Sequence, residues 1–468
     1  MPSTSKAYIK AGAIALAAVL LVAAPIGLSA EAAPDSITVG KAVEAALANN
    51  LSVMSASTES RIKKRASDWS FNKFLPSVST SATYLHLNQP QSVLTSYPYS
   101  SNPVFPTVMA YPESANNVAL GLTIQEVFSA TYFGLMDQAA IDYQRSAISK
   151  AQAERSITAA TKKIFYQLIV QDQTIELTRA RLDSAKERQR QAKVLFDLGQ
   201  GTELNYDYAT MDVENLTPGL RAMESGRAAA LTAFQEMLGY DSNPSMKLEG
   251  SLDDEAISVD NLPISEGDRF DVRLSRQNEK QLESALNIQR FAFLPNLVLQ
   301  YKADPVINGP GETILGNKID FWNTNNWNQS TGGISVTLSW DLSPLLPFSD
   351  IRKGKAEVED RLALAREATA QAIRAARDDA ANQLRSIKDS EDKIVSLTKV
   401  AEASKRAYEL TDAAYKLGTG RILDLQDAEV AWQGARIQLL NERLNVASLA
   451  FDFEAKYQSM EISKQTAK

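Results

Sequence analysis

Residues 198–201 read Leu-Gly-Gln-Gly, and 219 residues later residues 417–420 read Leu-Gly-Thr-Gly. The tripeptide Phe-Leu-Pro at residues 74–76 recurs at residues 293–295 with the same offset. Two landmarks that share one offset indicate an internal duplication. We therefore expect two structural repeats that follow one another along the chain.

The two expected repeats cover residues 33–250 and 251–468 and begin alike. Each opens with a helical stretch that contains neither Gly nor Pro, at residues 52–73 and 271–292. A Leu-Pro pair ends each helix soon afterwards, because Pro disfavours helical geometry in the residue before it. A new element is therefore expected after each Leu-Pro pair.

Strand hairpins are expected next, at residues 77–128 and 296–342. Apolar residues alternate with polar ones, as at Ile334, Val336 and Leu338, and this period of two is typical of a strand with one apolar face. A strand of about ten residues is long enough to cross a bilayer when tilted. Aromatic residues lie at the strand ends, as in outer-membrane barrels: Tyr84, Phe128, Tyr301 and Trp340. The pattern predicts membrane strands, with a soluble sandwich as the alternative.

Long helices are expected at residues 129–198 and 351–417, each roughly 100 Å long. Their apolar and small residues form narrow stripes, which fit coiled-coil seams rather than one globular face. Each long helix ends at a Leu-Gly-x-Gly turn, because Gly accepts the positive φ that often follows a helix. Return helices are expected at residues 204–238 and 422–457, the first of them kinked at Pro218.

The first 32 residues have the pattern of a secretory signal peptide. Lys6 and Lys10 precede an apolar run at residues 11–24, and Ala-Glu-Ala at residues 30–32 fits a cleavage site. A membrane anchor is the alternative, but a spanning helix needs about 20 apolar residues and this run is shorter. We therefore expect residues 1–32 to be removed from an exported protein.

The composition argues against several function classes. The chain has 49 Lys+Arg and 56 Asp+Glu and a net charge of −7, whereas nucleic-acid binders are usually basic. It has no Cys and one His, His86, which argues against thiolate metal sites, a lipid-bearing Cys and Ser-His-Asp triads. A mean hydropathy of −0.23 excludes a polytopic helical membrane protein. We expect a protein that is not an enzyme and that binds no cofactor, metal or nucleic acid.

The strand count predicts an assembly. Four strands per chain cannot close a transmembrane barrel, because open sheet edges do not survive in lipid. Three copies would supply twelve strands and twelve helical segments with threefold symmetry. The expected fold class is therefore an α+β membrane protein, a trimeric channel-tunnel in which a twelve-stranded β-barrel is continued by a long α-helical coiled-coil barrel.

The duplicated order of helix, Leu-Pro, strand hairpin, long helix, Leu-Gly-x-Gly and return helix resembles the TolC family of outer-membrane efflux proteins. The resemblance implies a homotrimer in outer membrane lipid, with a helical tunnel in the periplasm. It implies a passive exit duct for efflux or type I secretion, docked to a periplasmic adaptor (membrane fusion protein) and an inner-membrane pump of the RND, ABC or MFS class. The alternative is a periplasmic coiled-coil structural or adaptor protein without a channel, which would need no paired strands of bilayer length.

Two aspartates follow the second turn. Asp424 and Asp427 are three residues apart, which places both on one helix face. The resemblance implies that they ring the periplasmic entrance, so that a trimer presents six carboxylates that attract cations. The alternative is that they are solvated residues at a helix start, where Asp also suits the helix dipole.

The resemblance also implies a latch of side chains that holds this entrance shut. Tyr415 matches the family's latch tyrosine. The family's arginine follows Gly-Thr directly, whereas this chain has Gly420 there and Arg421 one place later. Asn205 stands where the family's first repeat has an aspartate, and an uncharged partner makes a weaker hydrogen bond. The expected adaptor-docking tips are Leu198, Gly199, Gly201, Leu417, Gly418 and Gly420.

Overall fold

The computed structural model describes most of the chain after residue 33. The described residues are 34–86, 92–96, 108–112, 116–252, 266–303, 306–308, 327–328 and 332–457. The expected signal peptide and most of the expected loops between strands lie outside them. The chain divides into two compact units, Met1–Asn50 with Ile164–Ser251 and Leu51–Lys163 with Leu252–Lys468. These units cut across the two expected repeats, whose division stays a prediction.

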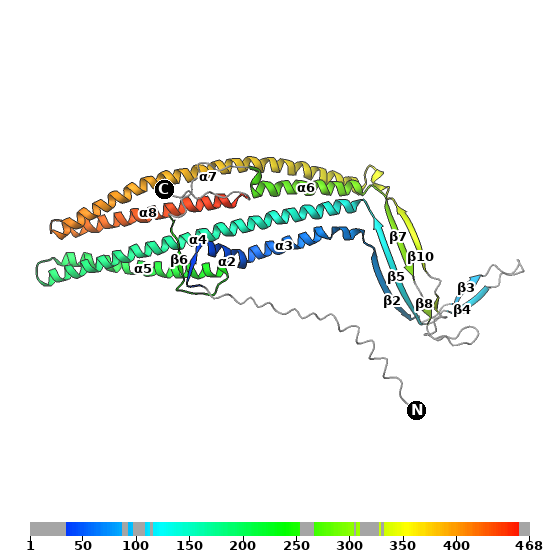
Figure 1. The fold of residues 1–468 in the computed structure, drawn as a ribbon, viewed down its shortest axis with the longest axis horizontal. Helices are drawn as coiled ribbons and strands as arrows, with labels where there is room; N and C mark the ends of the chain where they lie inside the picture. Colours follow the sequence, from blue (N-terminus) through cyan, green and yellow to red (C-terminus); the bar gives the residue numbers. More distant parts are fainter. Residues whose placement is uncertain are drawn as a thin grey trace, which may run out of the picture. The chain divides into compact units, whose positions relative to one another are not determined.

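The larger unit contains long helices and all of the longer strands. Its helices are α3 (Leu51–Asp68), the first part of α4 (Thr131–Asp197), α6 (Phe270–Phe291), α7 (Asp350–Lys416) and α8 (Ile422–Ala455). α8 returns alongside α7, and α6 also runs along α7 (Figure 1). Both α7 and α8 begin and end within two residues of the bounds expected from the sequence.

The helix before the first strand ends earlier than the sequence predicts. A helix is expected to reach residue 73, but α3 ends at Asp68 and a 3₁₀ turn, η1 (Ser70–Phe74), follows. The hydroxyl of Ser70 donates to the carbonyl oxygen of Ser67 at 2.7 Å. Such local side-chain bonds compete with the helical pattern, so the chain tightens before it reaches Pro76.

The longer strands of the larger unit form one antiparallel sheet (Figure 1). Its order is β10 (Gly332–Ser339), β7 (Asn296–Ala303), β5 (Asn116–Phe128) and β2 (Ser77–His86). β2 pairs with β5 and β7 pairs with β10 within the two stretches expected to form hairpins, and β5 pairs with β7 to join the two pairs. Shorter strands are β8 (Val306–Asn308), beside β5, β9 (Trp327–Asn328), beside β8, and the separate pair β3 (Ser92–Ser96) and β4 (Val108–Pro112).

The register gives this sheet one apolar face and one polar face. Ile124 lies opposite Val78 and Tyr301, and Tyr301 lies opposite Ile334. Because successive side chains of a strand point to opposite faces, this register assigns every other residue to the same face. The mainly apolar face carries Val78, Ala82, Leu122, Ile124, Leu297, Leu299, Ile334, Val336 and Leu338, together with Thr80 and Glu126. The mainly polar face carries Ser77, Ser79, Ser81, Thr123, Gln125, Asn296, Gln300, Ser335 and Thr337, together with Val127 and Val298.

The first part of α4 is fixed to α6 by a close helix approach. A Cβ added at Gly134 would lie 2.5 Å from the side chain of Ile288. The hydroxyl of Ser284 donates to the carbonyl oxygen of Gly134 at 3.1 Å. The backbone of α4 at Gly134 therefore packs directly against the side chain of Ile288 on α6, and only Gly leaves room for this approach.

The smaller unit combines a helical hairpin with a short strand pair. It contains α2 (Val39–Asn49), the second part of α4, α5 (Glu203–Leu238), and the parallel strands β1 (Ser36–Thr38) and β6 (Lys247–Glu249). α5 continues through Pro218, where the sequence predicts a kink. Its core includes Phe165, Tyr166 and Phe234. A narrow seam continues along the hairpin through Ile175, Leu182, Ala185, Val213 and Leu220.

Within the described part of the chain, no helix is both long enough and apolar enough to span a membrane.

Candidate functional site: hairpin tips and two-faced sheet

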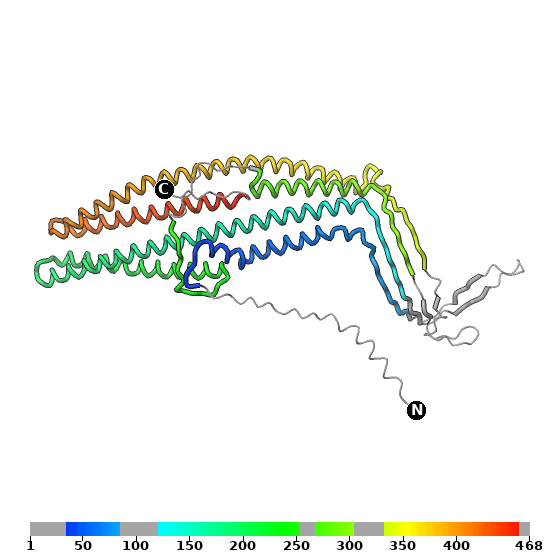
Figure 2. Tube along the Cα trace, viewed as in Figure 1, coloured from blue at the N-terminus to red at the C-terminus, as the bar shows by residue number. Residues whose placement is uncertain are grey.

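The second hairpin tip reverses the chain between α7 and α8 (Figure 2). Gly418 has a φ of 74°, a conformation that favours Gly. The amides of Thr419 and Gly420 both donate to the carbonyl oxygen of Ala414 at 3.0 Å. A Cβ at Gly420 would lie 2.9 Å from the nitrogen of Tyr415. The two glycines of the motif thus have different tasks, since one supplies the positive φ and the other leaves room for the backbone.

The first hairpin tip, between α4 and α5, repeats this geometry. Gly199 has a φ of 69°. The amides of Gln200 and Gly201 donate to the carbonyl oxygen of Leu195 at 2.8 and 2.9 Å. A Cβ at Gly201 would lie 3.0 Å from the Cβ of Leu195. The turn is then capped by Thr202, whose hydroxyl accepts from the amide of Asn205 at 3.3 Å.

Both tips present an exposed leucine. Leu198 and Leu417 follow the long helices and are among the most exposed large apolar residues of the described chain. The backbone of each turn is bonded internally, so contact with another protein would rely on side chains. The expected docking residues therefore form two turns of the same backbone, each in its own unit.

The two aspartates lie on the outer face of α8. Ile422 and Leu425 are buried against α7, whereas Asp424 and Asp427 are exposed. Neither carboxylate has an ion-pair partner within the described residues. In a single chain they are free acidic groups in the first turns of a helix, where the helix dipole favours negative charge. A role at a constriction depends on neighbouring copies.

The expected latch residues are divided between the two tips. Tyr415 is half-buried on α7, and Arg421 is exposed at the start of α8 without capping it. Asn205 lies at the other tip, in the smaller unit, with its side chain exposed. Tyr415 and Arg421 thus belong to the larger unit and Asn205 to the smaller one.

Stacked aromatic pairs brace each hairpin, and the sequence reasoning missed them. Tyr408 of α7 stacks on Trp432 of α8 with ring centroids 5.0 Å apart. Phe196 of α4 lies parallel to Tyr206 of α5 at 6.3 Å. The signal was available, because an aromatic residue precedes each turn and another follows it on the return helix.

The four expected interface aromatics are exposed at the sheet. Tyr84, Phe128 and Tyr301 belong to the apolar face by register, and Trp340 directly follows β10. The indole nitrogen of Trp340 donates to the carbonyl oxygen of Phe293 at 3.1 Å, so the ring is held beside the start of β7. These rings therefore border the apolar face rather than entering a protein core.

A charge cluster around the buried Arg269 lies where α6, α7 and α8 meet. The guanidinium of Arg269 donates to Asp271 Oδ2 and Asp379 Oδ2, both at 2.7 Å, and Lys456 Nζ donates to the same oxygen of Asp379 at 2.7 Å. Burial acts to raise the pKa of Asp379, but the bonds from Lys456 and Arg269 outweigh it and leave this pKa lowered. Burial likewise acts to lower the pKa of Arg269, and its carboxylate partners reverse the effect.

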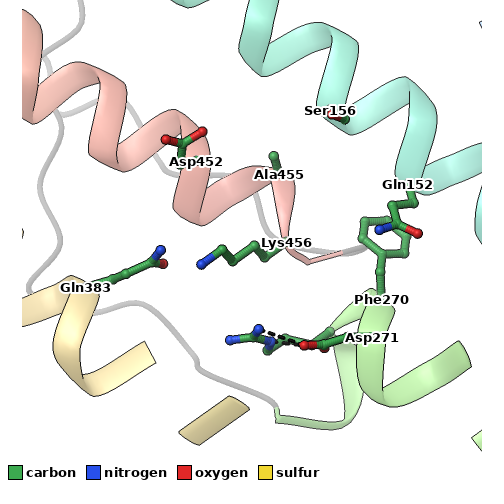
Figure 3. Close-up of a pocket in the computed structure, with 9 residues that line it drawn as sticks. Gln152, Ser156, Phe270, Asp271, Gln383, Asp452, Ala455 and Lys456 are labelled. Carbon is green, nitrogen blue, oxygen red and sulfur yellow. Dashed lines mark hydrogen bonds and ion pairs between the residues drawn. The ribbon is translucent and has the colours of Figure 1, made fainter. Parts of the chain in front are cut away.

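The same cluster borders a cavity of about 450 Å³ (Figure 3). Gln152 and Ser156 of α4 line it opposite Asp271 and Lys456. Since the charged groups are bonded to one another, they fasten the end of α8 to α6 and α7. Among the described residues, no group of acidic, His or Cys side chains could hold a metal ion.

Comparisons with known proteins identify a matching family model and several similar folds. Residues 265–450 match the family model of outer membrane efflux proteins. The fold is similar to the Campylobacter jejuni CmeC outer membrane channel, with a TM-score of 0.69 and 17% identity over 91% of this chain and 88% of that one. It is similar to the Neisseria gonorrhoeae MtrE outer membrane channel in its open state, with a TM-score of 0.68 and 20% identity over 92% and 91%.

The outer membrane protein VceC of Vibrio cholerae has a TM-score of 0.66 and 14% identity over 89% of this chain and 94% of that one. No curated protein sequence matches the chain. The family model and the shared helical channel fold agree with the duplicated turns and the two-faced sheet. Residues 265–450 are thus similar in sequence to the outer membrane efflux proteins, and the fold of most of the chain is similar to the folds of outer membrane channels.

Proposed function

We propose that three copies of this chain form one closed tube through which cargo leaves the periplasm and crosses the outer membrane. The two-faced sheet carries the proposal. On its apolar face Ile334, Val336 and Leu338 are 80%, 65% and 68% exposed. A row of this kind needs a nonaqueous cover, and lipid supplies one while the Ser- and Thr-rich face lines water.

The edges of the sheet support assembly with further copies. Among the described strands, β2 pairs only with β5, and β10 pairs along its length only with β7. Unpaired backbone groups cost several kcal/mol each in lipid. β2 and β10 run in opposite directions, because three antiparallel pairings separate them. The β2 edge of one copy can therefore pair antiparallel with the β10 edge of the next, and three copies give twelve strands.

The helices would continue this barrel into the periplasm. The long helices α4 and α7 have 67 residues each and are roughly 100 Å long, much longer than a bilayer is thick, and the return helices α5 and α8 are about half that length. Their seams are narrow, which leaves other faces of each helix for neighbouring hairpins. A ring of such hairpins is a tunnel that shields cargo from the periplasm.

The tips would dock a periplasmic adaptor, which links the duct to an inner-membrane pump. Leu198 and Leu417 supply the apolar contacts, and the glycines set the turns that present them. Asp424 and Asp427 would line the entrance of the tunnel in six copies, giving a strongly negative mouth. Tyr415, Arg421 and Asn205 would form the latch between neighbouring hairpins.

A periplasmic coiled-coil adaptor without a channel is the competing function. It would share the helical hairpins and the apolar seams. It would have no use for a sheet with eight or more residues per strand and one exposed apolar face. The sheet is therefore the observation that favours a duct.

The test uses two neighbouring residues that face opposite sides of the sheet. Val336→Arg puts a cation on the apolar face, where it costs about 3 kcal/mol near the bilayer middle, and it should lower the yield of outer-membrane trimers. Thr337→Arg puts the same cation on the polar face, and trimers should form with altered cation conductance in planar bilayers. A wild-type chain that sediments as a water-soluble monomer would overturn the proposal.

A further inference from the structure

The two strand-to-helix junctions of the larger unit differ in length. β5 ends at Phe128 and α4 begins at Thr131, whereas β10 ends at Ser339 and α7 begins only at Asp350. Residues 340–349 of the longer link read Trp-Asp-Leu-Ser-Pro-Leu-Leu-Pro-Phe-Ser, with one charged side chain, Asp341. Because two residues suffice at the first junction, joining strand to helix does not by itself require this link.

The longer link exposes large apolar side chains. Phe348 is 97% exposed, and Leu345 and Leu346 are 64% and 62% exposed. Leu342 is exposed as well, and no charged residue lies between it and Phe348. We define residues 342–348 as the apolar link. Scattered apolar residues on a surface are normal, but a contiguous set indicates a contact with something other than water.

Hydrogen bonds hold the apolar link in one conformation. Its 3₁₀ turn, η5 (Ser343–Leu345), is closed by a bond of 3.0 Å from the amide of Leu345 to the carbonyl oxygen of Leu342. Pro344 is buried, and its carbonyl oxygen accepts from Arg352 Nε at 2.7 Å. The outward leucines and Phe348 are therefore presented by a fastened backbone.

We infer that the apolar link is an anchor that lies in the headgroup and upper acyl region of the periplasmic phospholipid leaflet. This inference rests on the proposed function, in which the apolar face of the sheet meets lipid. The link is continuous with that face, because Trp340 follows β10 directly and the apolar link begins two residues later. Lipid that covers Val336 and Leu338 would extend onto the link.

The charges around the link fit a lipid interface. The apolar link has no charge of its own, so its burial among acyl chains leaves no charge to desolvate. Asp341 precedes the link and Asp350 begins α7 two residues after it, and the exposed cations Arg352 and Lys353 follow in the first turn of α7. Cations beside an apolar segment are typical of interfacial anchors, because they reach the lipid phosphates while the apolar residues enter the membrane.

A neighbouring copy of the chain is the other surface that could cover the link, and depth-resolved labelling distinguishes the two. Since the chain has no Cys, single Cys substitutions can carry an environment-sensitive fluorophore at Leu345 and at Phe348. The trimer is reconstituted in vesicles of phosphatidylethanolamine and phosphatidylglycerol with nitroxide-labelled phosphatidylcholine, the nitroxide placed near the headgroup or deep in the acyl chain. We expect blue-shifted emission and a greater loss of intensity with the shallow nitroxide.

Two further labels separate this inference from the proposed function. A label at Val336, in the middle of β10, should be quenched most by the deep nitroxide, and one at Glu357, exposed on α7, should be quenched by neither. If the Val336 label is not quenched, the sheet does not cross lipid and the proposed function fails with the anchor. If Val336 is quenched but the Leu345 and Phe348 labels are not, the link contacts protein or water and only the anchor is overturned.

Discussion

The two hairpin tips share one backbone and differ in side-chain chemistry. Gly199 and Gly418 have nearly the same positive φ, and both turns close on a single carbonyl oxygen of the last helical turn. The offset of 219 residues that relates the turns pairs Asp424 with Asn205 and Asp427 with Tyr208. The two aspartates of the second tip therefore have no acidic counterpart at the equivalent positions of the first, which carries Glu203 and Asp207 instead. A duplicated turn can keep its geometry through two glycines while the residues that follow acquire different functions.

Replacing the positive-φ glycines should have the largest effect, because the turn at each tip depends on that backbone conformation. Gly199→Val and Gly418→Val force a β-branched residue into a conformation that costs about 1–3 kcal/mol. We expect export of a pump substrate to fall to background in either variant, while trimers still form in the outer membrane. Drug susceptibility and native gels measure the two outcomes.

The matched control is Gly226→Val. This glycine lies inside α5 with open space around it and without a positive φ, so export should be retained. Normal export by both tip variants would mean that the turns do not dock a partner.

Removing the acidic pair tests what distinguishes the tips. In the double variant Asp424→Asn, Asp427→Asn, block of single-channel current by a trivalent cation on the periplasmic side should disappear, because the negative mouth is neutralised. Assembly should be unchanged, since both side chains are exposed on α8.

The difference between the tips can also be tested by introducing the acidic pair at the first tip. Asn205→Asp with Tyr208→Asp gives the first tip aspartates at the positions equivalent to Asp424 and Asp427, and block should occur at a lower cation concentration than in wild type. If the first double variant is still blocked as wild type is, the two aspartates are solvated residues at a helix start.

The aromatic braces should have a moderate effect. Trp432→Ala removes the closer of the two stacks and should destabilise the second hairpin more than Tyr206→Ala destabilises the first. A double-mutant cycle with Tyr408→Ala should give a coupling of about 1 kcal/mol. Denaturant unfolding in detergent measures it, and a coupling near zero would mean that the stack is incidental.

The smallest effect concerns charge order before each turn. Asp412 precedes Lys416 on α7, which suits the helix dipole, whereas Lys193 precedes Asp197 on α4 in the unfavourable order. The bond to Asp412 also raises the pKa of Lys416. Exchanging Lys193 and Asp197 should stabilise the end of α4 by about 0.5 kcal/mol or less. Slower amide hydrogen exchange at residues 194–198 would report it, and exchange at residues 413–417 is the internal control.

Local rules were enough to predict the turns and the strands. Gly418 and Gly420 were identifiable because positive φ and close backbone approach are properties of a few neighbouring residues. The alternation at Ile334, Val336 and Leu338 was identifiable because one apolar face requires a period of two. Neither prediction depends on contacts between residues that are far apart in the sequence.

Distant pairings could not be read from the sequence. Arg269 meets Asp379 across 110 residues, and charged residues on helices are too common for one such pair to stand out. The pairing of β5 with β7 joins two hairpins that the sequence analysis treated separately. The early end of α3 depends on the hydroxyl of Ser70, which bonds to the carbonyl oxygen of Ser67. Helix propensities alone do not account for such a bond.

The parity of the sheet register restricts how copies can fit together. Even-numbered residues form the apolar face on both β2 and β10. A seam between copies must therefore pair even with even, and the next allowed alignment is two residues, or about 7 Å, away. In the proposed barrel, a slip of one residue would turn Ile334 toward the water-filled interior and Ser335 toward lipid along the whole edge. Subunits can thus join only in discrete alignments, so the tilt and width of a barrel are selected from a few widely spaced values rather than adjusted gradually.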